Sequence, residues 1–137
     1  MRVRDRMTRE VVTVSTGETI RSVWDLVEEK GLRRFPVMSS GSLVGMVTDR
    51  DLRNAIASSV VLTEKKYHDF LLDTIKVESI MTADPVAAGP DDDLKGAART
   101  ILEMKFGGMP VVEDGVLVGI ITETDLIEAL IEILPDD

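Results

Sequence analysis

A four-residue pattern, Thr-x-x-Asp, occurs twice in the chain, each time after a short apolar run that begins with Gly. The first copy is GMVTDRD, residues 45–51, and the second is GIITETD, residues 119–125. An ionised carboxylate can accept hydrogen bonds from two vicinal hydroxyls, such as those of a ribose. A helix that begins at the Thr would offer unpaired backbone N–H groups and a partial positive charge to a phosphate. Each corner could therefore bind a phosphorylated sugar.

The same spacing is also typical of a helix capping box. In that device the Thr hydroxyl accepts a hydrogen bond from the backbone N–H of the Asp, and the Asp carboxylate accepts one from the Thr N–H. The pairs would be Thr48 with Asp51 and Thr122 with Asp125. The sequence leaves both roles open, although an Asp that caps its own backbone is less available to a ribose.

Both corners belong to an internal repeat. A shift of 74 residues aligns residues 7–56 with residues 81–130 without a gap, and 14 of these 50 pairs are identical. A solenoid needs about three or more repeats to be stable, so two copies indicate a pseudo-symmetric pair of units instead. Gene duplication could have copied either a cap or a ligand site.

Each copy predicts the element order β-α-β-β-α. The opening strands are expected at VVTVS (11–15) and PVAAG (85–89), and Gly with polar residues between apolar runs predicts a hairpin in each copy. The closing helices are expected to begin at Asp49 and Glu123. In the second of these, Leu126 and Leu130 are expected to face inward.

Apolar residues at helical spacing predict a helix after each opening strand. The two stripes are Ile20, Val23, Trp24 and Val27 in the first copy and Leu94, Ala97, Ala98 and Ile101 in the second. Ser15 and Glu18 predict a capping box for the first helix, and the acids Asp91–Asp93 suit the positive end of the second. Between the copies, Tyr67, Phe70, Leu71 and Ile75 predict a further helix or an extension of the preceding one.

The composition excludes several classes of function. The chain has no Cys and a single His, His68, so it has no thiol chemistry and no multi-His metal site. The net charge is −9, made up of +1 over residues 1–74 and −10 over residues 75–137, and aromatic residues are few. Nucleic-acid binding is therefore not expected. No apolar run is long enough for a membrane span and the charged start lacks a signal peptide's apolar core, which predicts a soluble cytoplasmic protein.

Four short motifs recur in both copies: an opening Met-Thr, a mid-unit Pro-Val, a Gly-x-Leu-Val-Gly hairpin and the Thr-x-x-Asp corner. They lie at Met7-Thr8, Pro36-Val37, Gly41–Gly45 and 45–51, and again at Met81-Thr82, Pro110-Val111, Gly115–Gly119 and 119–125. This combination resembles the cystathionine β-synthase (CBS) domain. Nearly the whole chain resembles a stand-alone tandem pair, or Bateman module, and the insert is similar to that of acetoin-utilisation-type CBS proteins.

The resemblance implies an α/β (α+β) fold of two pseudo-twofold-related β-α-β-β-α units packed through their sheets. The expected division is a first CBS domain at 1–60, a partly helical linker at 61–76 and a second CBS domain at 77–137. CBS pairs bind adenosine-containing ligands such as AMP, ADP or ATP, with NAD and S-adenosylmethionine as further options. The chain is thus expected to be a regulatory module that signals to an unknown partner protein. It would need no cofactor beyond an adenine nucleotide as ligand, and it would not be an enzyme.

The resemblance also implies roles for nine residues. The Asp of each corner would bind ribose, its Thr would contact ribose or phosphate, residues before each Pro-Val would serve the other copy's phosphate, and glycines would leave room for the base. These residues are Thr48, Asp51, Thr122, Asp125, Arg33, Arg34, Lys105, Gly107 and Gly108. Arg33 and Arg34 would face the Asp125 corner and Lys105 the Asp51 corner, so the Asp125 corner is expected to bind better. Alternatively, the two arginines form a solvated turn.

A second hypothesis is a ligand-independent dimerisation or interaction module. Its apolar helix IEALIEIL (127–134) would pack against a second copy or a partner protein. A homodimer is expected under either hypothesis. An enzyme is disfavoured because the chain has no Cys, no activated Ser-His pair and no Gly-rich phosphate loop.

Overall fold

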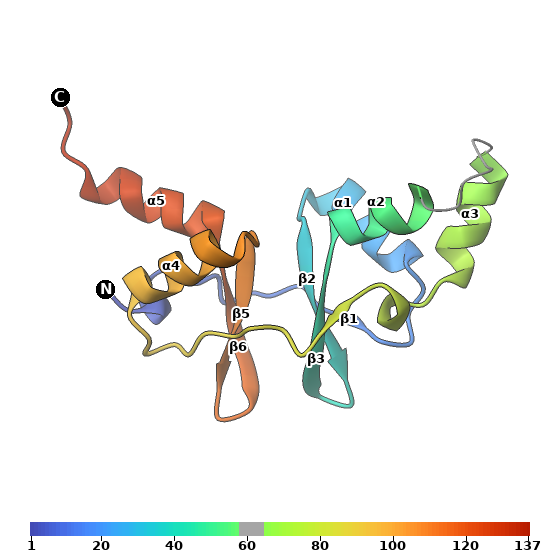
Figure 1. Ribbon diagram of the computed structural model, residues 1–137, viewed down its shortest axis with the longest axis horizontal. Coiled ribbons are helices and arrows are strands. Elements are labelled where there is room, and N and C mark those ends of the chain that lie inside the picture. Colours follow the sequence, from blue (N-terminus) through green and yellow to red (C-terminus); the bar gives the residue numbers. More distant parts are fainter. Residues whose placement is uncertain (58–64) are drawn as a thin grey trace. The chain divides into compact units, whose positions relative to one another are not determined.

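The computed structural model describes residues 1–57 and 65–137, which form two compact units (Figure 1). We call residues 12–84 unit N, and residues 1–11 together with 85–137 unit C. The expected division at 1–60 and 77–137 follows the repeat along the sequence, and these boundaries stay a prediction. The division by contacts differs in one respect, because the opening segment of each repeat packs in the unit of the other.

In its described residues, unit N has a four-stranded sheet and three α-helices. Strand β1 runs parallel to β2, and β2, β3 and β4 are antiparallel in that order. The strands are β1 (Val14–Ser15), β2 (Arg34–Ser39), β3 (Ser42–Thr48) and β4 (Thr82–Ala83), and the helices are α1 (Arg21–Lys30), α2 (Asp49–Ala57), α3 (Lys65–Thr74) and the short 3-10 helix η2 (Val77–Ser79). The three α-helices gather around one end of the β2–β3 hairpin, whose turn points away from them (Figure 1).

Unit C repeats this plan with a two-stranded hairpin. Its elements are the 3-10 helix η1 (Val3–Asp5), α4 (Leu94–Met104), β5 (Gly108–Glu113), β6 (Val116–Thr122) and α5 (Glu123–Ile133). The strand expected at PVAAG is reduced to a single parallel bridge between Ala88 and Val111. Pro85 and Pro90 lack a backbone N–H, and Ala88 makes both hydrogen bonds, one to the carbonyl of Pro110 and one from Val112. The β-α-β-β-α order predicted from sequence is thus confirmed in both units.

The two hairpins turn in the same way. Ser40-Gly41 and Asp114-Gly115 have φ angles of 50° and 80° in both cases. Two successive residues with positive φ are the geometry that two-residue hairpin turns favour, because it matches the right-handed twist of the strands. The turn fixes the register, so that Arg34 lies opposite Thr48 and Gly108 lies opposite Thr122. The predicted hairpins therefore bring the residues before each Pro-Val beside the Thr of the corner in the same unit.

The opening Met-Thr of each repeat completes the sheet of the other repeat. Thr82 pairs with Met46 of β3, and Thr8 pairs with Ile120 of β6. A Cβ on Gly45 would lie 2.4 Å from the sulfur of Met81 and 3.0 Å from the carbonyl oxygen of Thr82. A Cβ on Gly119 would meet Met7 and the carbonyl oxygen of Thr8 at 2.8 and 2.9 Å. Gly is thus required at both positions, because the Met-Thr segment of the other repeat passes too close to leave room for a side chain.

The first helix begins later than the sequence predicts. The Ser15 N–H donates to the Glu18 carboxylate at 2.5 Å, as in the predicted capping box, but α1 starts only at Arg21. Residues 18–20 are instead held by an extended segment, since Ile20 donates to the carbonyl of Ile75 and Val77 donates to that of Glu18. The predicted cap is therefore wrong as a helix start, because a tertiary pairing replaces the first helical turn.

Each unit has its own apolar core. In unit N, Ile20 and Val23 of the predicted stripe are buried with Phe35 and Val47, and Trp24 packs against this cluster. In unit C the core includes Leu94, Ala97, Ile101, Met109 and Ile121. The expectation for Leu130 was wrong, because its side chain is 52% exposed, whereas Ala129 of the same helix is buried.

Helix α3 is attached to α1 by ion pairs. Arg21 donates to Asp73 at 2.9 Å and to Asp69 at 3.1 Å. Leu72 is the buried residue of the helix, while Phe70 is 58% exposed. Residues 58–64 of the insert lie outside the described residues. None of the helices in the described ranges is both long and apolar enough to cross a membrane.

Candidate functional site

The corner in unit N joins β3 to α2 through a complete capping box. The N–H of Thr48 donates to Asp51 Oδ2 at 2.9 Å, and the N–H of Asp51 donates to Thr48 Oγ1 at 3.1 Å. Asp51 is half-buried. Among the residues that the structure describes, its carboxylate accepts this one hydrogen bond, so Oδ1 remains available. The corner therefore caps α2 and still offers a carboxylate oxygen.

The corner in unit C has the same box and further contacts. The N–H of Thr122 donates to Asp125 Oδ2 at 2.9 Å and the Thr122 hydroxyl donates to the same oxygen at 3.0 Å. The hydroxyl of Thr8, 117 residues away in sequence, donates to Asp125 Oδ1 at 3.0 Å. Asp125 is only 8% exposed. Both carboxylate oxygens are thus engaged by protein groups.

The residues next to each corner differ strongly in charge. Arg33 and Arg34 flank the corner of unit N: the carbonyl of Arg33 accepts from the N–H of Asp49 at 2.9 Å, and Arg34 lies opposite Thr48. Within the described ranges, no hydrogen bond or ion pair engages the guanidinium groups of Arg33, Arg34 or Arg50. These cations lie close in sequence and register to the positive end of α2, an arrangement that suits an anion.

Gly107 and Gly108 take the same places in unit C. The carbonyl of Gly107 accepts from the N–H of Glu123 at 2.9 Å, and Gly108 lies opposite Thr122. This corner therefore has two glycines where unit N has two cationic side chains. The pairings inferred from the resemblance, in which Arg33 and Arg34 serve the Asp125 corner and Lys105 the Asp51 corner, stay predictions.

Lys105 ends α4 in a left-handed conformation. Its φ angle is 58°, and the side chain is exposed. The aligned residue at the end of α1 is Gly31, with φ of 65°. Glycine adopts this conformation without steric cost, whereas a side chain does not. A Lys is unusual at such a helix end, where Gly is the common residue. It places a cation shortly before Gly107 and Gly108.

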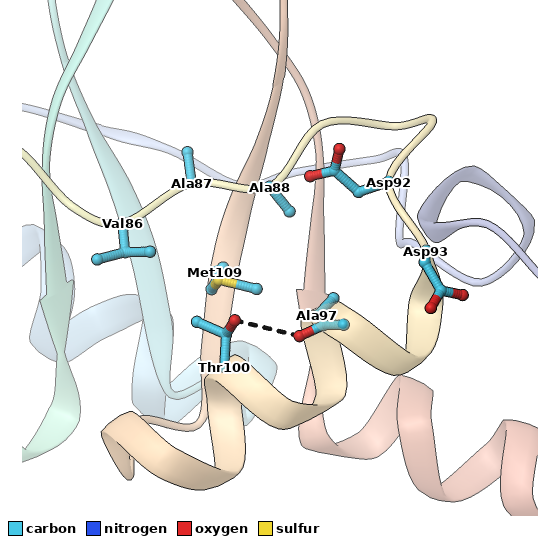
Figure 2. A pocket seen from close by; sticks show the side chains of 9 residues that line it. Val86, Ala87, Ala88, Asp92, Asp93, Ala97, Thr100 and Met109 are labelled. Carbon is cyan, nitrogen blue, oxygen red and sulfur yellow. Dashed lines mark hydrogen bonds between the residues drawn. The ribbon is translucent and has the colours of Figure 1, made fainter.

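A cavity that the sequence did not predict lies in unit C (Figure 2). It has a volume of about 350 Å³ and is bounded by the segment after Pro85, one face of α4 and the start of β5. Small residues shape it: Ala87, Ala88, Gly96 and Ala97 stand where the first repeat has Thr13, Val14, Ser22 and Val23. That exchange of large for small residues was the signal in the sequence. The cavity contains no predicted site residue, although Met109 on its wall directly follows Gly108.

A second, apolar groove runs between α4 and α5. Its volume is about 560 Å³, and its lining includes Leu94, Ala98, Leu126, Leu130 and Ile133. Beyond the groove, Ile131 is 70% exposed. Helix α5, which the second hypothesis expects to contact another protein surface, therefore presents apolar side chains to the surface of unit C as well as to its core.

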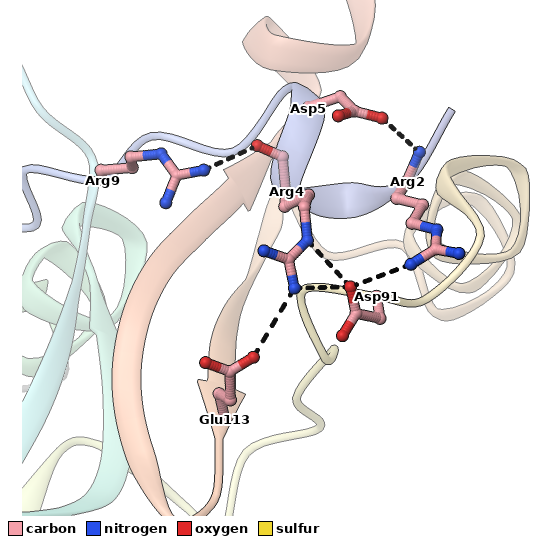
Figure 3. A network of polar contacts seen from close by, with 6 residues as sticks. All are labelled: Arg2, Arg4, Asp5, Arg9, Asp91 and Glu113. Carbon is pink, nitrogen blue, oxygen red and sulfur yellow. Dashed lines mark hydrogen bonds and ion pairs between the residues drawn. The ribbon is translucent and has the colours of Figure 1, made fainter.

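Arginines of the N-terminal segment attach it to the rest of unit C (Figure 3). Arg4 Nε and Arg2 Nη1 donate to Asp91 Oδ1 at 2.8 and 3.2 Å, and Arg6 pairs with Glu132 at 2.5 Å. The hydrogen bond from Arg4 lowers the pKa of Asp91, and that from Arg6 lowers the pKa of Glu132. The acidic cluster at Asp91–Asp93 is therefore a structural anchor and helix start. The part of the chain that the structure describes contains no group of three or more residues that could hold a metal ion.

The comparisons with known proteins agree with this architecture. The family model of the CBS domain matches residues 3–58 and 77–132. The crystal structure of CBSX2 of Arabidopsis thaliana in complex with AMP is 30% identical, with a TM-score of 0.83 over 98% of this chain and 99% of that one. A structure assigned as the acetoin utilization protein AcuB of Vibrio cholerae is 31% identical, with a TM-score of 0.81 over 96% of this chain and 91% of that one.

A relative from the archaeon Methanocaldococcus jannaschii, an uncharacterized protein, is 34% identical over 135 residues. The match covers 96% of this chain and 45% of the relative, so the chain spans less than half of that protein's length. The family match, which includes both Thr-x-x-Asp corners, covers most of the chain. The chain belongs to the CBS domain family, and it carries two copies of the domain.

Proposed function

We propose that this CBS pair is a regulatory module that binds an adenosine-containing ligand and passes on its occupancy to a partner protein. The observation that carries the proposal is the Asp51 corner. There a half-buried carboxylate with a free oxygen stands at a helix start, beside arginines that have no partner in the described chain. The full-length likeness to CBSX2, which was crystallised with AMP, supports the choice of ligand class.

The chemistry of the corner fits a nucleoside monophosphate. Asp51 Oδ1 can accept hydrogen bonds from a ribose diol while Oδ2 continues to cap α2. The positive end of α2 and the guanidinium groups of Arg33 and Arg34 can offset the charge of a phosphate. The full set of proposed ligand-binding residues is Thr48, Asp51, Thr122, Asp125, Arg33, Arg34, Lys105, Gly107 and Gly108.

Calorimetric titration with AMP, ADP, ATP, NAD and S-adenosylmethionine tests the proposal. We expect saturable binding, and about 2.7 kcal/mol of stabilisation at a hundredfold excess of ligand over Kd. Asp51→Ala should weaken binding by far more than the ~1 kcal/mol that a lost cap costs in stability.

Asp5→Ala is the matched control for the lost cap. The Asp5 carboxylate accepts from the Arg2 N–H at 2.7 Å in a box of the same spacing, remote in sequence from both corners. This variant should lose a comparable hydrogen bond and keep full affinity. The proposal is wrong if no ligand of the panel binds the wild-type chain or shifts its melting temperature.

A second candidate is a ligand-independent dimerisation or interaction module. The apolar groove between α4 and α5, with Ile127, Leu130 and Ile133 about half-exposed, favours contact with another protein surface. We propose a homodimer through this face under either function. Sedimentation of Ile127→Glu should then report a monomer, whereas Val116→Glu, a change at an equally exposed position in the β5–β6 hairpin, should leave the dimer intact. A wild-type chain that sediments as a monomer at all concentrations would contradict the homodimer.

A further inference from the structure

The two aspartates are held to different extents. Asp125 accepts three hydrogen bonds, from the Thr122 N–H, the Thr122 hydroxyl and the Thr8 hydroxyl, whereas Asp51 accepts one within the described chain. A carboxylate has about four lone-pair sites, and a vicinal diol needs two of them. Asp51 can meet that need as it stands. Asp125 has to give up a bond first.

Thr8 is held rigidly in the position from which it reaches Asp125. Its N–H donates to the carbonyl of Ile120 at 2.8 Å, and its carbonyl accepts from the N–H of Ile120 at 2.9 Å. Val3 is fully buried in the core of unit C, and the ion pairs of Arg4 with Asp91 and of Arg6 with Glu132 hold the residues that follow it. The backbone contacts thus hold the Thr8 hydroxyl within hydrogen-bond distance of Asp125.

The aligned residue in unit N makes no such contact. Thr82 pairs with Met46 as Thr8 pairs with Ile120, yet no hydrogen bond joins its side chain to Asp51 in the part of the chain described. The two repeats therefore share the Thr and its backbone pairing but not the bond to the carboxylate. Identical motifs thus leave one carboxylate open and the other closed.

We propose that Thr8 is a positioning residue that closes the Asp125 corner to a ribose diol, so that the two corners of the chain bind an adenosine ligand with unequal affinity. The inference rests on the proposed function and adds an order of occupancy. The Asp51 corner fills first, and the Asp125 corner fills only when the Thr8 bond is exchanged for one to the ligand. Loss of a hydrogen bond to a buried charged group weakens binding there by about tenfold or more.

Titration of AMP into the full chain and its variants tests this order. Asp51→Ala should remove the tighter binding event. In that background, Thr8→Val keeps the shape of the side chain and removes the hydroxyl, and it should tighten the remaining event by about tenfold. Thr8→Ser keeps the hydroxyl and should leave that event unchanged. Thr82→Val is the matched control and should change neither affinity, and thermal melting should confirm that all variants fold.

The outcomes separate this inference from the proposed function. If AMP binds the wild-type chain but Thr8→Val leaves the weaker event unchanged, the closing role of Thr8 is refuted and the nucleotide function stands. If Asp125→Ala, and not Asp51→Ala, removes the tighter event, the order of occupancy is reversed and the inference is equally refuted. If no ligand of the panel binds any variant, the function itself fails and the inference falls with it.

Discussion

The two Thr-x-x-Asp corners have the same local geometry and different surroundings. In each, the Thr N–H donates to the carboxylate at 2.9 Å and the helix begins one residue after the Thr. The corner of unit N has cationic neighbours and an open carboxylate. The corner of unit C has glycine neighbours and a buried carboxylate that also binds Thr8. Both copies thus keep the capping box, and residues outside the motif decide which groups each corner can bind.

The two arginines lie beside the corner of their own unit. From sequence, the arginines were expected to favour the Asp125 corner. The described contacts place Arg33 and Arg34 beside the corner of their own unit, where Asp51 is the freer acceptor. That they also serve the Asp125 corner stays a prediction.

The largest loss of stability is expected at the Gly that begins each corner motif, where the two units are alike. Gly45→Ala and Gly119→Ala should each destabilise the fold by about 1–3 kcal/mol, because the new methyl group meets the backbone oxygen of Thr82 or Thr8 at 3.0 or 2.9 Å. Urea denaturation measures the loss. Gly17→Ala, whose Cβ would meet nothing within 4 Å, is the control and should be close to neutral. If Ala is tolerated at Gly119 but not at Gly45, the Met-Thr segment beside Gly119 can move away from the new methyl group and the one beside Gly45 cannot.

A comparable loss of stability should distinguish the two aspartates. Asp125→Ala removes a buried acceptor that two hydroxyls and one N–H share, and we expect it to cost about 2–3 kcal/mol. Asp51→Ala loses only a cap at a half-buried site and should cost about 1 kcal/mol. Denaturation in the absence of ligand gives both values. Equal losses would contradict the unequal engagement of the two carboxylates.

The helix ends before the two corners should respond in opposite directions. Lys105→Gly should stabilise the chain by about 1 kcal/mol, since Lys105 is in the left-handed region at φ of 58°. Gly31→Lys should destabilise it by a similar amount, because Gly31 has φ of 65°. Thermal melting of the two variants against wild type tests this. A neutral or destabilising Lys105→Gly would indicate that the Lys side chain makes a compensating contribution.

The smallest expected effect is on the loss of stability at low pH. The pKa of Asp91 in unit C is lowered by Arg4, and the pKa of Asp73 in unit N is lowered by Arg21. A carboxyl group whose pKa is lower in the folded state stabilises the fold above its unfolded pKa of about 3.9, and that contribution is lost as pH falls through the folded value. Asp91→Asn and Asp73→Asn should therefore each flatten the loss of stability below about pH 4. Acid titrations followed by circular dichroism would show it, and unchanged slopes would contradict the ion pairs.

Much of the fold was predictable because its signals are local. The hairpin turns at Ser40-Gly41 and Asp114-Gly115 and the starts of α2 and α5 depend on contacts between residues at most a few positions apart. The start of α1 was mispredicted because residues 18–20 pair with residues 75–77, which the local pattern cannot reveal. The cavity beside Met109 was missed although its small residues were visible in the repeat alignment.

The sequence by itself determined the repeat and the β-α-β-β-α order, and its motifs resemble those of the CBS domain family. The element order follows from apolar spacing and turn chemistry, which act over a few residues. Only the tertiary structure decided that Met7-Thr8 and Met81-Thr82 complete each other's sheets and that Thr8 reaches Asp125 across 117 positions. Such contacts depend on how the packed chain places distant segments, and so identical motifs became unequal corners.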